Sequence, residues 1–245
     1  MMWKLIAALI VALLSVGCSG LAPAPADDAR IEAVLRETLR KYPVLVRDAL
    51  IALQESERAE ERERASRVIQ SRKSALFEDP DSPVGGNPSG DVTVVQFFDY
   101  RCGYCKRVLP TLVELTRRDG GVRVVYKEFP VLGPESRRAA LAALAAQRQG
   151  KYLGFHHALM GGEEVNDSAI QRIADTLAID SARFLKDIDA PDLAKRVETN
   201  LALGAAIGVN GTPAFIVGDR LIPGAVGIDE LTRLVDEARS SSKKN

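Results

Sequence analysis

The chain is poor in metal-binding and aromatic side chains and carries no excess of charge. Its 245 residues include two histidines, three cysteines and 5% aromatic residues, and 33 basic residues balance 33 acidic ones. Without a net positive charge, it lacks the electrostatic signature of a nucleic-acid-binding protein. So few cysteines and histidines exclude a disulfide-stapled small domain and a multi-metal protein. The 46% of apolar residues are enough to form a buried core.

The first apolar run is too short to cross a bilayer as a helix. It extends from Leu5 to Leu14, whereas a membrane-spanning helix needs about 20 residues. One lysine precedes this run and small residues follow it, which is the pattern of a signal peptide at residues 1–17. We therefore expect the protein to be exported from the cytoplasm.

Cys18 follows this segment directly. The sequence around it resembles the lipobox of bacterial lipoproteins, in which the cysteine is lipidated and becomes the first residue, although Ser15 replaces the usual leucine. Lipidation would anchor the protein to a membrane, with the Ala- and Pro-rich residues 18–27 as a flexible tether. The alternative is ordinary cleavage near residue 26, which would discard Cys18.

Residues 28–78 are predicted to be helical, with one interruption at Pro43. Between Glu55 and Lys73, eleven of nineteen residues are charged, which predicts a solvated helix. Before this stretch, apolar side chains recur at helical spacing. They are Ile31, Val34, Leu35, Tyr42, Val46, Ala49, Leu50 and Leu53. A charged rod cannot bury them, so we expect this segment to need a partner, such as another copy of the chain.

The second half of the chain alternates strands and helices. Residues 79–90 are rich in proline and glycine, which indicates a linker. A strand at 92–98, a helix at about 102–118 and a strand at 122–129 imply a parallel pair with a right-handed crossover. The remaining predicted elements are helices throughout 134–208, a hairpin at 214–222 and a helix at about 229–239. This order predicts an α/β fold with a helical insertion.

Cys102 and Cys105 lie at the start of the helix that follows the first strand. Free backbone N–H groups and the helix dipole stabilise a thiolate at such a position. We therefore expect Cys102 to be exposed and to ionise more readily than a free thiol. Cys105 is one helical turn further on and would close or resolve a disulfide with it.

A structural disulfide and half of a zinc site are the alternative interpretations of this cysteine pair. A structural disulfide would not need a strand-to-helix junction. Zinc needs about four ligands, and the sequence has no second cysteine pair. His156 and His157 are adjacent in a predicted helix and point in different directions, so we expect them at the surface or core edge, not as ligands. No metal site is predicted.

A proline near the end of the chain supports the redox interpretation. Pro213 begins the late strand, a position that proline tolerates on ordinary grounds. A cis Thr212–Pro213 bond would instead bend the chain and expose the Thr212 backbone beside the thiols. There the backbone could pair in strand fashion with a substrate peptide.

Together these features resemble the thioredoxin fold of the DsbA family. The runs Phe97–Cys105 and Gly211–Phe215 carry the likeness. The resemblance implies a thioredoxin-like domain at 91–241 with its helical insertion at about 134–208. It implies a periplasmic thiol–disulfide oxidoreductase, either oxidase or isomerase, whose redox-active Cys102–Cys105 disulfide is its only cofactor. Gly103 and Tyr104 would form the active-site dipeptide, and Thr212 and Pro213 the substrate-binding loop.

The helical N-terminal segment is similar to that of ScsC-type suppressors of copper sensitivity. In that subgroup such helices assemble the catalytic domains into a trimer that behaves as a disulfide isomerase. The likeness implies a homo-oligomer, with unfolded or misoxidised exported proteins as clients and no nucleic acid. It also implies a membrane partner that reoxidises or reduces the dithiol. The alternative function is binding of Cu(I) by the same two thiols.

One departure from the DsbA pattern concerns proton transfer. Gln96 occupies the family's position for a buried acid, six residues before Cys102. A proton relay would then use Asp99 or Glu128. For Asp99, the alternative is a loop acid without a catalytic part. For Glu128, which lies at a strand end, a surface position is the default expectation. A glutathione transferase-like enzyme shares the fold but would need neither Cys105 nor a signal peptide.

Overall fold

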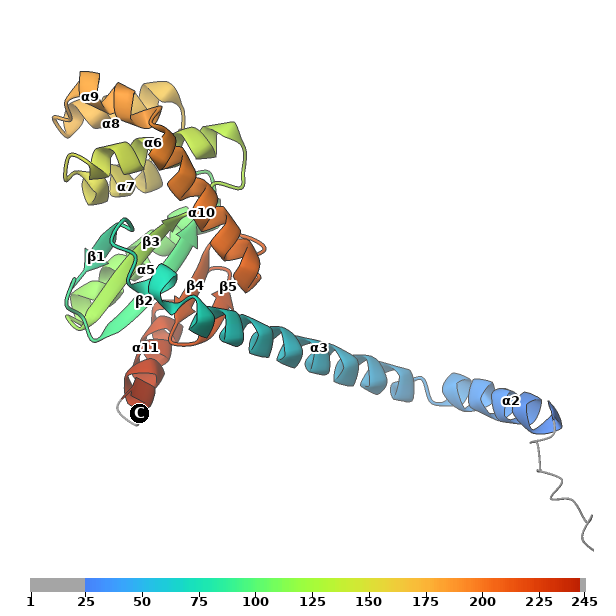
Figure 1. Cartoon of the computed structure of the whole chain (residues 1–245). Coiled ribbons are helices and arrows are strands. Elements are labelled where there is room, and N and C mark those ends of the chain that lie inside the picture. Colours follow the sequence, from blue (N-terminus) through green and yellow to red (C-terminus); the bar gives the residue numbers. More distant parts are fainter. Residues whose placement is uncertain (1–24, 243–245) are drawn as a thin grey trace, which may run out of the picture. The chain divides into compact units, whose positions relative to one another are not determined.

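The computed structural model describes residues 25–242 of the chain (Figure 1). The predicted signal peptide at 1–17, Cys18 and the tether up to residue 24 lie outside the described residues. None of the described helices is long and apolar enough to cross a membrane. The chain divides into two compact units at Glu57 and Arg58. We call residues 25–57 the N-terminal helical unit and residues 58–242 the sheet unit.

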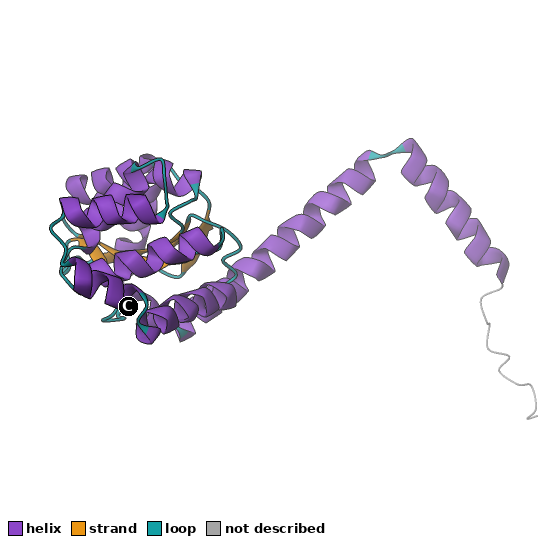
Figure 2. Ribbon diagram, turned by 90° about the horizontal axis from the view of Figure 1, so that it is seen from above, coloured by secondary structure: helices purple, strands orange, loops and turns teal. Residues whose placement is uncertain are grey.

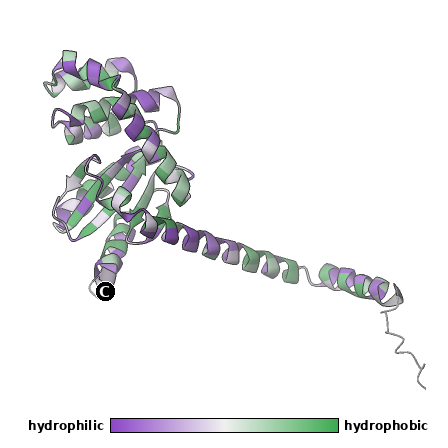
Figure 3. Ribbon diagram, viewed as in Figure 1, coloured by the Kyte–Doolittle hydropathy of each residue, from purple (hydrophilic) through white to green (hydrophobic). Residues whose placement is uncertain are grey.

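The N-terminal helical unit consists of α2 (Pro25–Lys41) and the first part of α3 (Val44–Ser71), and Pro43 separates the two helices as predicted. Its ion pairs are local, such as Arg36 with Glu32 at 2.7 Å. In Figure 3, the ribbons of both helices are coloured as hydrophobic in part. The large apolar side chains of this unit are exposed. They are Ile31, Val34, Leu35, Leu39, Tyr42, Val44, Leu45, Val46, Leu50, Ile51 and Leu53. This unit therefore has no core of its own.

A five-stranded sheet of order β1-β3-β2-β4-β5 organises the sheet unit. The strands are β1 (Val84–Gly86), β2 (Val92–Phe98), β3 (Val122–Glu128), β4 (Ala214–Val217) and β5 (Arg220–Pro223). β2 and β3 are parallel, as predicted, and the other neighbouring pairs are antiparallel. The β-branched and aromatic run of β2 is buried on both faces, which suits a central strand.

Further helices belong to the sheet unit, and several of them cover the sheet (Figure 2). They are α4 (Lys73–Phe77), α5 (Gly103–Arg118), α6 (Pro134–Gln147), α7 (Tyr152–Gly161), α8 (Asp167–Thr176), α9 (Ser181–Ile188), α10 (Pro191–Ile207) and α11 (Ile228–Ser242). The predicted helical insertion is confirmed as α6 to α10. The side chains of Asn166 and Asp180 cap the first turns of α8 and α9.

Alternate side chains of the central strands enter two cores. Val94 and Phe98 face one core with α5 and α11, whereas Phe97 faces a second core on the opposite side of the sheet. The second core includes Ile69 of α3 and Leu76 of α4. The end of α3 is thus packed, not a fully solvated rod, and the sheet unit begins before the predicted domain start at residue 91.

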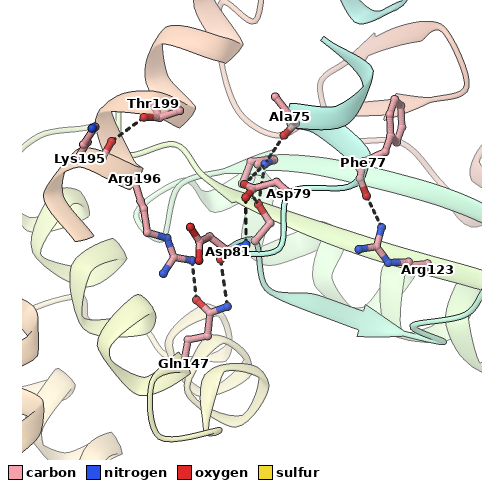
Figure 4. A network of polar contacts seen from close by, with 11 residues as sticks. Ala75, Phe77, Asp79, Asp81, Arg123, Gln147, Lys195, Arg196 and Thr199 are labelled. Carbon is pink, nitrogen blue, oxygen red and sulfur yellow. Dashed lines mark hydrogen bonds and ion pairs between the residues drawn. The ribbon is translucent and has the colours of Figure 1, made fainter. Parts of the chain in front are cut away.

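Residues 79–90, expected to be a linker, instead contain β1 and a buried polar network (Figure 4). Lys127 of β3 is fully buried. Its Nζ donates hydrogen bonds to Ala75 O at 2.7 Å, Asp79 Oδ2 at 2.8 Å and Ser82 Oγ at 2.6 Å. Burial lowers the pKa of Lys127, although its pairing with Asp79 opposes the shift. The network fastens this segment to the sheet.

Candidate active site

Cys102 is the N-cap of α5, at the junction that follows β2. Its Sγ accepts a hydrogen bond from the Cys105 backbone N–H at 3.4 Å and donates one to Thr212 O at 3.1 Å. Both cysteines are free thiols. The fold therefore brings the thiol pair to the Thr212 backbone, 110 positions along the chain.

The predicted exposure of Cys102 is wrong, because this residue is only 7% exposed. Its sulfur turns inward to the Thr212 carbonyl and the Cys105 N–H. Cys105 is more deeply buried. Burial raises the pKa of the Cys105 thiol well above its usual range, and a hydrogen bond to the Asp99 backbone only partly opposes this shift. Cys105 is therefore held as a neutral thiol.

The cis bond between Thr212 and Pro213 is confirmed. The Pro213 carbonyl accepts a hydrogen bond from the Gly224 N–H at 2.8 Å, which ties this turn to the residue after β5. The Thr212 carbonyl points to the Cys102 sulfur. The backbone beside the thiols is thus held at a fixed place next to α5.

The residues around the cysteines form a partly apolar, partly charged surface. The Tyr104 side chain is 59% exposed, and the Arg107 guanidinium lies 4.1 Å from its ring centroid. Gly103 is exposed before it. Arg101 pairs at 3.0 Å with Glu135 in the first turn of α6, which balances its charge.

Asp99 is buried and ties two loops together. Its carboxylate accepts hydrogen bonds from the backbone N–H groups of Arg101 at 2.8 Å and of Val131 and Leu132 at 2.9 Å each. The Ser136 hydroxyl donates a fourth, at 2.7 Å. These four bonds occupy both carboxylate oxygens and hold the loop after β3 against the active-site turn.

Glu128 is also buried, which overturns the expectation of a surface position. Register explains the difference, because Glu128 pairs with Phe98 and so points to the same core as that side chain. Its Oε1 accepts hydrogen bonds from the hydroxyl groups of Tyr152 at 2.8 Å and Tyr100 at 3.1 Å. Burial raises the pKa of Glu128 to about 8, although both phenols oppose the shift.

His156 lies in the same cluster, not at the surface or core edge as predicted. Its Nδ1 lies 3.1 Å from the Tyr100 hydroxyl. Its ring is stacked on Tyr152 and lies edge-on to Phe98. Burial lowers the pKa of His156 to about 3, so this ring is neutral. Nothing in the sequence indicated the tyrosines, but the alternation of side chains along β3 could have placed Glu128 on a buried face. The preceding side chains on that face are Val122, Val124 and Tyr126.

Gln96 is buried on β2, and its Oε1 has no hydrogen-bond partner among the described residues. The strand position that carries an acid in DsbA proteins is therefore occupied by a neutral amide. Within residues 25–242, no three His, Cys, Asp or Glu side chains are grouped so that they could hold a metal ion.

Comparison with known proteins identifies the domain that carries this site. The family model described as DSBA-like thioredoxin domain matches residues 93–236. Among curated proteins, the Na⁺/H⁺ antiporter NhaA 3 of Salinispora tropica is 31% identical over 169 residues, which cover 67% of this chain and 26% of the antiporter. The chain thus spans about a quarter of the length of such relatives.

Several solved structures resemble larger shares of the chain. A thioredoxin-like oxidoreductase from Silicibacter pomeroyi has 46% identity and a TM-score of 0.67, covering 68% of this chain and 97% of its own. Proteus mirabilis ScsC in a transitional conformation has 30% identity and a TM-score of 0.67, covering 88% and 98%. The thiol-disulfide exchange protein alpha-DsbA2 of Wolbachia pipientis has 32% identity and a TM-score of 0.66, covering 71% and 95%.

Proposed function

This chain belongs to the family of DSBA-like thioredoxin domains, and from that premise we propose that it exchanges disulfides with exported proteins in the periplasm, as an isomerase or an oxidase. The family makes it an oxidoreductase that uses a redox-active disulfide and no other cofactor. One observation carries the assignment of the site: the Cys102 sulfur lies 3.1 Å from the carbonyl of Thr212, the residue before the cis proline.

In the reducing direction, the Cys102 thiolate attacks one sulfur of a client disulfide. The client S–S bond breaks, a mixed disulfide forms, and one client sulfur leaves as a thiolate. Cys105 then loses its proton and attacks the Cys102 sulfur. The Cys102–Cys105 disulfide forms, the second client thiolate leaves, and two electrons have passed to the client. Oxidation of a client dithiol is the same sequence in reverse. In isomerisation, another client thiolate attacks the client sulfur of the mixed disulfide, a new client disulfide forms and Cys102 leaves as a thiolate, with no net transfer of electrons.

The proton of Cys105 needs an acceptor when this thiol attacks. Of the two acids predicted for the relay, Glu128 is the better candidate, because its pKa of about 8 lets it hold or release a proton near neutral pH. The Asp99 carboxylate already accepts four hydrogen bonds from the loops around it. Asp99 therefore holds those loops in place.

The client chain would bind along the backbone of Thr212 and Pro213. An extended peptide there gains main-chain hydrogen bonds in the manner of an added strand. The exposed ring of Tyr104 and the adjoining Gly103 would contact the client on the opposite side of the thiols.

The choice of isomerase rests on the N-terminal helical unit. Its exposed apolar residues favour burial against further copies of the same unit, and a trimer would present several thiol pairs around one client. An isomerase must also be kept reduced by a membrane partner. The predicted signal peptide supports export, and lipidation of Cys18 would hold the assembly at a membrane.

Client turnover by the full chain tests the proposed activity. Wild-type protein should restore native disulfides to a scrambled client, and Cys102→Ser should lose at least about a thousand-fold of that rate because the nucleophile is gone. Loss of the residues before 58 should shift activity from isomerisation towards oxidation. Full activity of Cys102→Ser would contradict the proposal.

Cu(I) binding is the second candidate, favoured by two free thiols on one helical turn. Thiolates are the ligands that Cu(I) prefers. Titration of the reduced protein with Cu(I), beside the turnover measurement, separates the two functions. Tight binding together with an absence of client turnover would favour the copper role.

A further inference from the structure

Asp99 joins the cysteine turn to a second loop. Its backbone carbonyl accepts the Cys102 N–H at 3.1 Å. Its carboxylate accepts the N–H groups of Val131 and Leu132 at 2.9 Å each. One buried residue therefore fixes both the cysteine turn and the segment after β3. Asp99 makes both sets of hydrogen bonds without having to transfer a proton.

The segment that Asp99 holds displays two apolar side chains. Val131 is 46% exposed and Leu132 is 45% exposed. The Leu132 carbonyl also accepts a hydrogen bond from the Arg101 guanidinium at 2.8 Å, so a second contact joins it to the residue before Cys102. Their backbone is held by hydrogen bonds, although both residues are largely exposed. Such an arrangement presents side chains for contact at low cost in conformational entropy.

We propose that Asp99 is a positioning residue that holds Val131 and Leu132 beside Cys102 as an apolar contact for client chains. The inference rests on the proposed function and names its substrate class. The matching client is an unfolded polypeptide with an apolar side chain near its reactive cysteine, because folded proteins bury most such side chains. The contact raises the affinity for client chains, whereas a small dithiol does not reach it.

The first test removes one apolar side chain without touching the fold. Leu132→Ser is compared with Leu185→Ser, since Leu185 lies on α9 in the helical insertion and is similarly exposed, at 48%. For each variant, the kcat/KM for an unfolded client is divided by the rate of exchange with dithiothreitol. Leu132→Ser should lower this ratio about ten-fold, mainly by raising KM. Leu185→Ser should leave it at the wild-type value.

The second test removes the fixing group. In Asp99→Asn, one carboxylate oxygen becomes an NH₂ group, which cannot accept the hydrogen bonds that the loops donate. Amide hydrogen exchange at Val131 and Leu132 should accelerate at least ten-fold, and the client-to-dithiothreitol ratio should fall as in Leu132→Ser. Unchanged protection of those two amides would overturn the positioning role, whatever the activity.

The outcomes separate this inference from the proposed function. If the wild-type chain exchanges with clients but Leu132→Ser and Leu185→Ser give the same ratio, the apolar contact is refuted and the proposed function stands. If the wild-type chain exchanges with dithiothreitol but with no client, the proposed function and the contact both fail. A fall in the ratio for both Leu132→Ser and Asp99→Asn supports the inference.

Discussion

The N-terminal helical unit and the sheet unit differ in whether they bury their apolar side chains. The sheet unit places alternate residues of its strands in two cores and closes them with helices from distant parts of the chain. The N-terminal helical unit has an apolar pattern of similar regularity, but its side chains remain exposed. One unit therefore buries its apolar side chains within the chain, whereas the other leaves them exposed.

The polar interactions differ in the same way. In the sheet unit, Lys127 pairs with Asp79 across 48 positions of the chain, and Glu128 meets Tyr100 and Tyr152 in the core. The ion pairs of the N-terminal helical unit join residues at most four positions apart, such as Glu32 and Arg36. Long-range polar contacts define one arrangement of the chain, whereas local pairs only support helices.

The largest effect should come from charging the apolar face of the N-terminal helical unit. Leu35→Glu combined with Leu50→Glu would place two carboxylates where we propose that copies of the chain meet. Light scattering should then give the mass of one chain, where the wild type gives a multiple of it. Leu185→Glu, on α9 of the sheet unit, is the matched control and should leave the mass unchanged. A monomeric wild type would remove the basis of this part of the comparison.

A second substitution tests whether the sheet unit depends on its long-range ion pair. Lys127→Met keeps an apolar stem but leaves Asp79, Ser82 and the Ala75 carbonyl without their shared donor. We expect the free energy of unfolding to fall by about 2–4 kcal/mol, near the value for breaking buried pairs, as measured in urea. A loss below about 0.5 kcal/mol would show that the network is dispensable.

The pH dependence of stability tests the buried acid. Since the pKa of Glu128 is raised from 4.5 to about 8, the folded state holds a proton that the unfolded state releases between these values. The free energy of unfolding should therefore fall as pH rises from 4.5 to 8, by at most about 1.4 kcal/mol per pH unit. Glu128→Gln should remove this slope.

Comparing Glu128→Gln with the wild type cancels the contributions that the other titrating groups of the cluster make to the pH dependence of stability. Burial also lowers the pKa of the neighbouring His156 to about 3, which costs stability as pH falls below 6.5 in both proteins. The difference between the two unfolding free energies thus isolates the carboxyl group. If the unfolding free energies of the two proteins changed in parallel from pH 5 to 8, the pKa of Glu128 would not be raised by the fold.

The smallest effect should come from a local ion pair of the N-terminal helical unit. Glu32→Gln removes the partner of Arg36, and both side chains are well exposed. We expect helix content in circular dichroism to change by an amount equivalent to only about 0.3–0.5 kcal/mol. If Glu32→Gln cost as much free energy as Lys127→Met, local and long-range ion pairs would be equally important, and the two units would not differ in this respect.

Much of the fold follows from local patterns in the sequence. The β-branched run at 92–98, the cysteine pair at a helix start and the helices after Pro134 were predicted from periodicity and turn residues, and the structure confirms these elements. The cis Thr212–Pro213 bond was inferred from the proline beside a redox pair. These features depend on residues near one another in the chain.

The features that sequence reasoning missed depend on distant partners. β1 lies in a segment whose proline and glycine content indicates a linker, and only its pairing with β3 makes it a strand. Glu128 and His156 looked like surface residues because polar side chains usually are. Tyr100 and Tyr152 make their burial tolerable, and a single sequence gives no sign of which polar groups will meet.

The central claim is that Cys102 is the sulfur that joins the client, and trapping tests it most directly. Cys105→Ala removes the resolving thiol, so a mixed disulfide with an oxidised, unfolded client should accumulate. Peptide mapping by mass spectrometry should locate the bond at Cys102. Absence of any adduct from Cys105→Ala, or its formation to the same extent in the Cys102→Ser/Cys105→Ala double variant, would contradict the account.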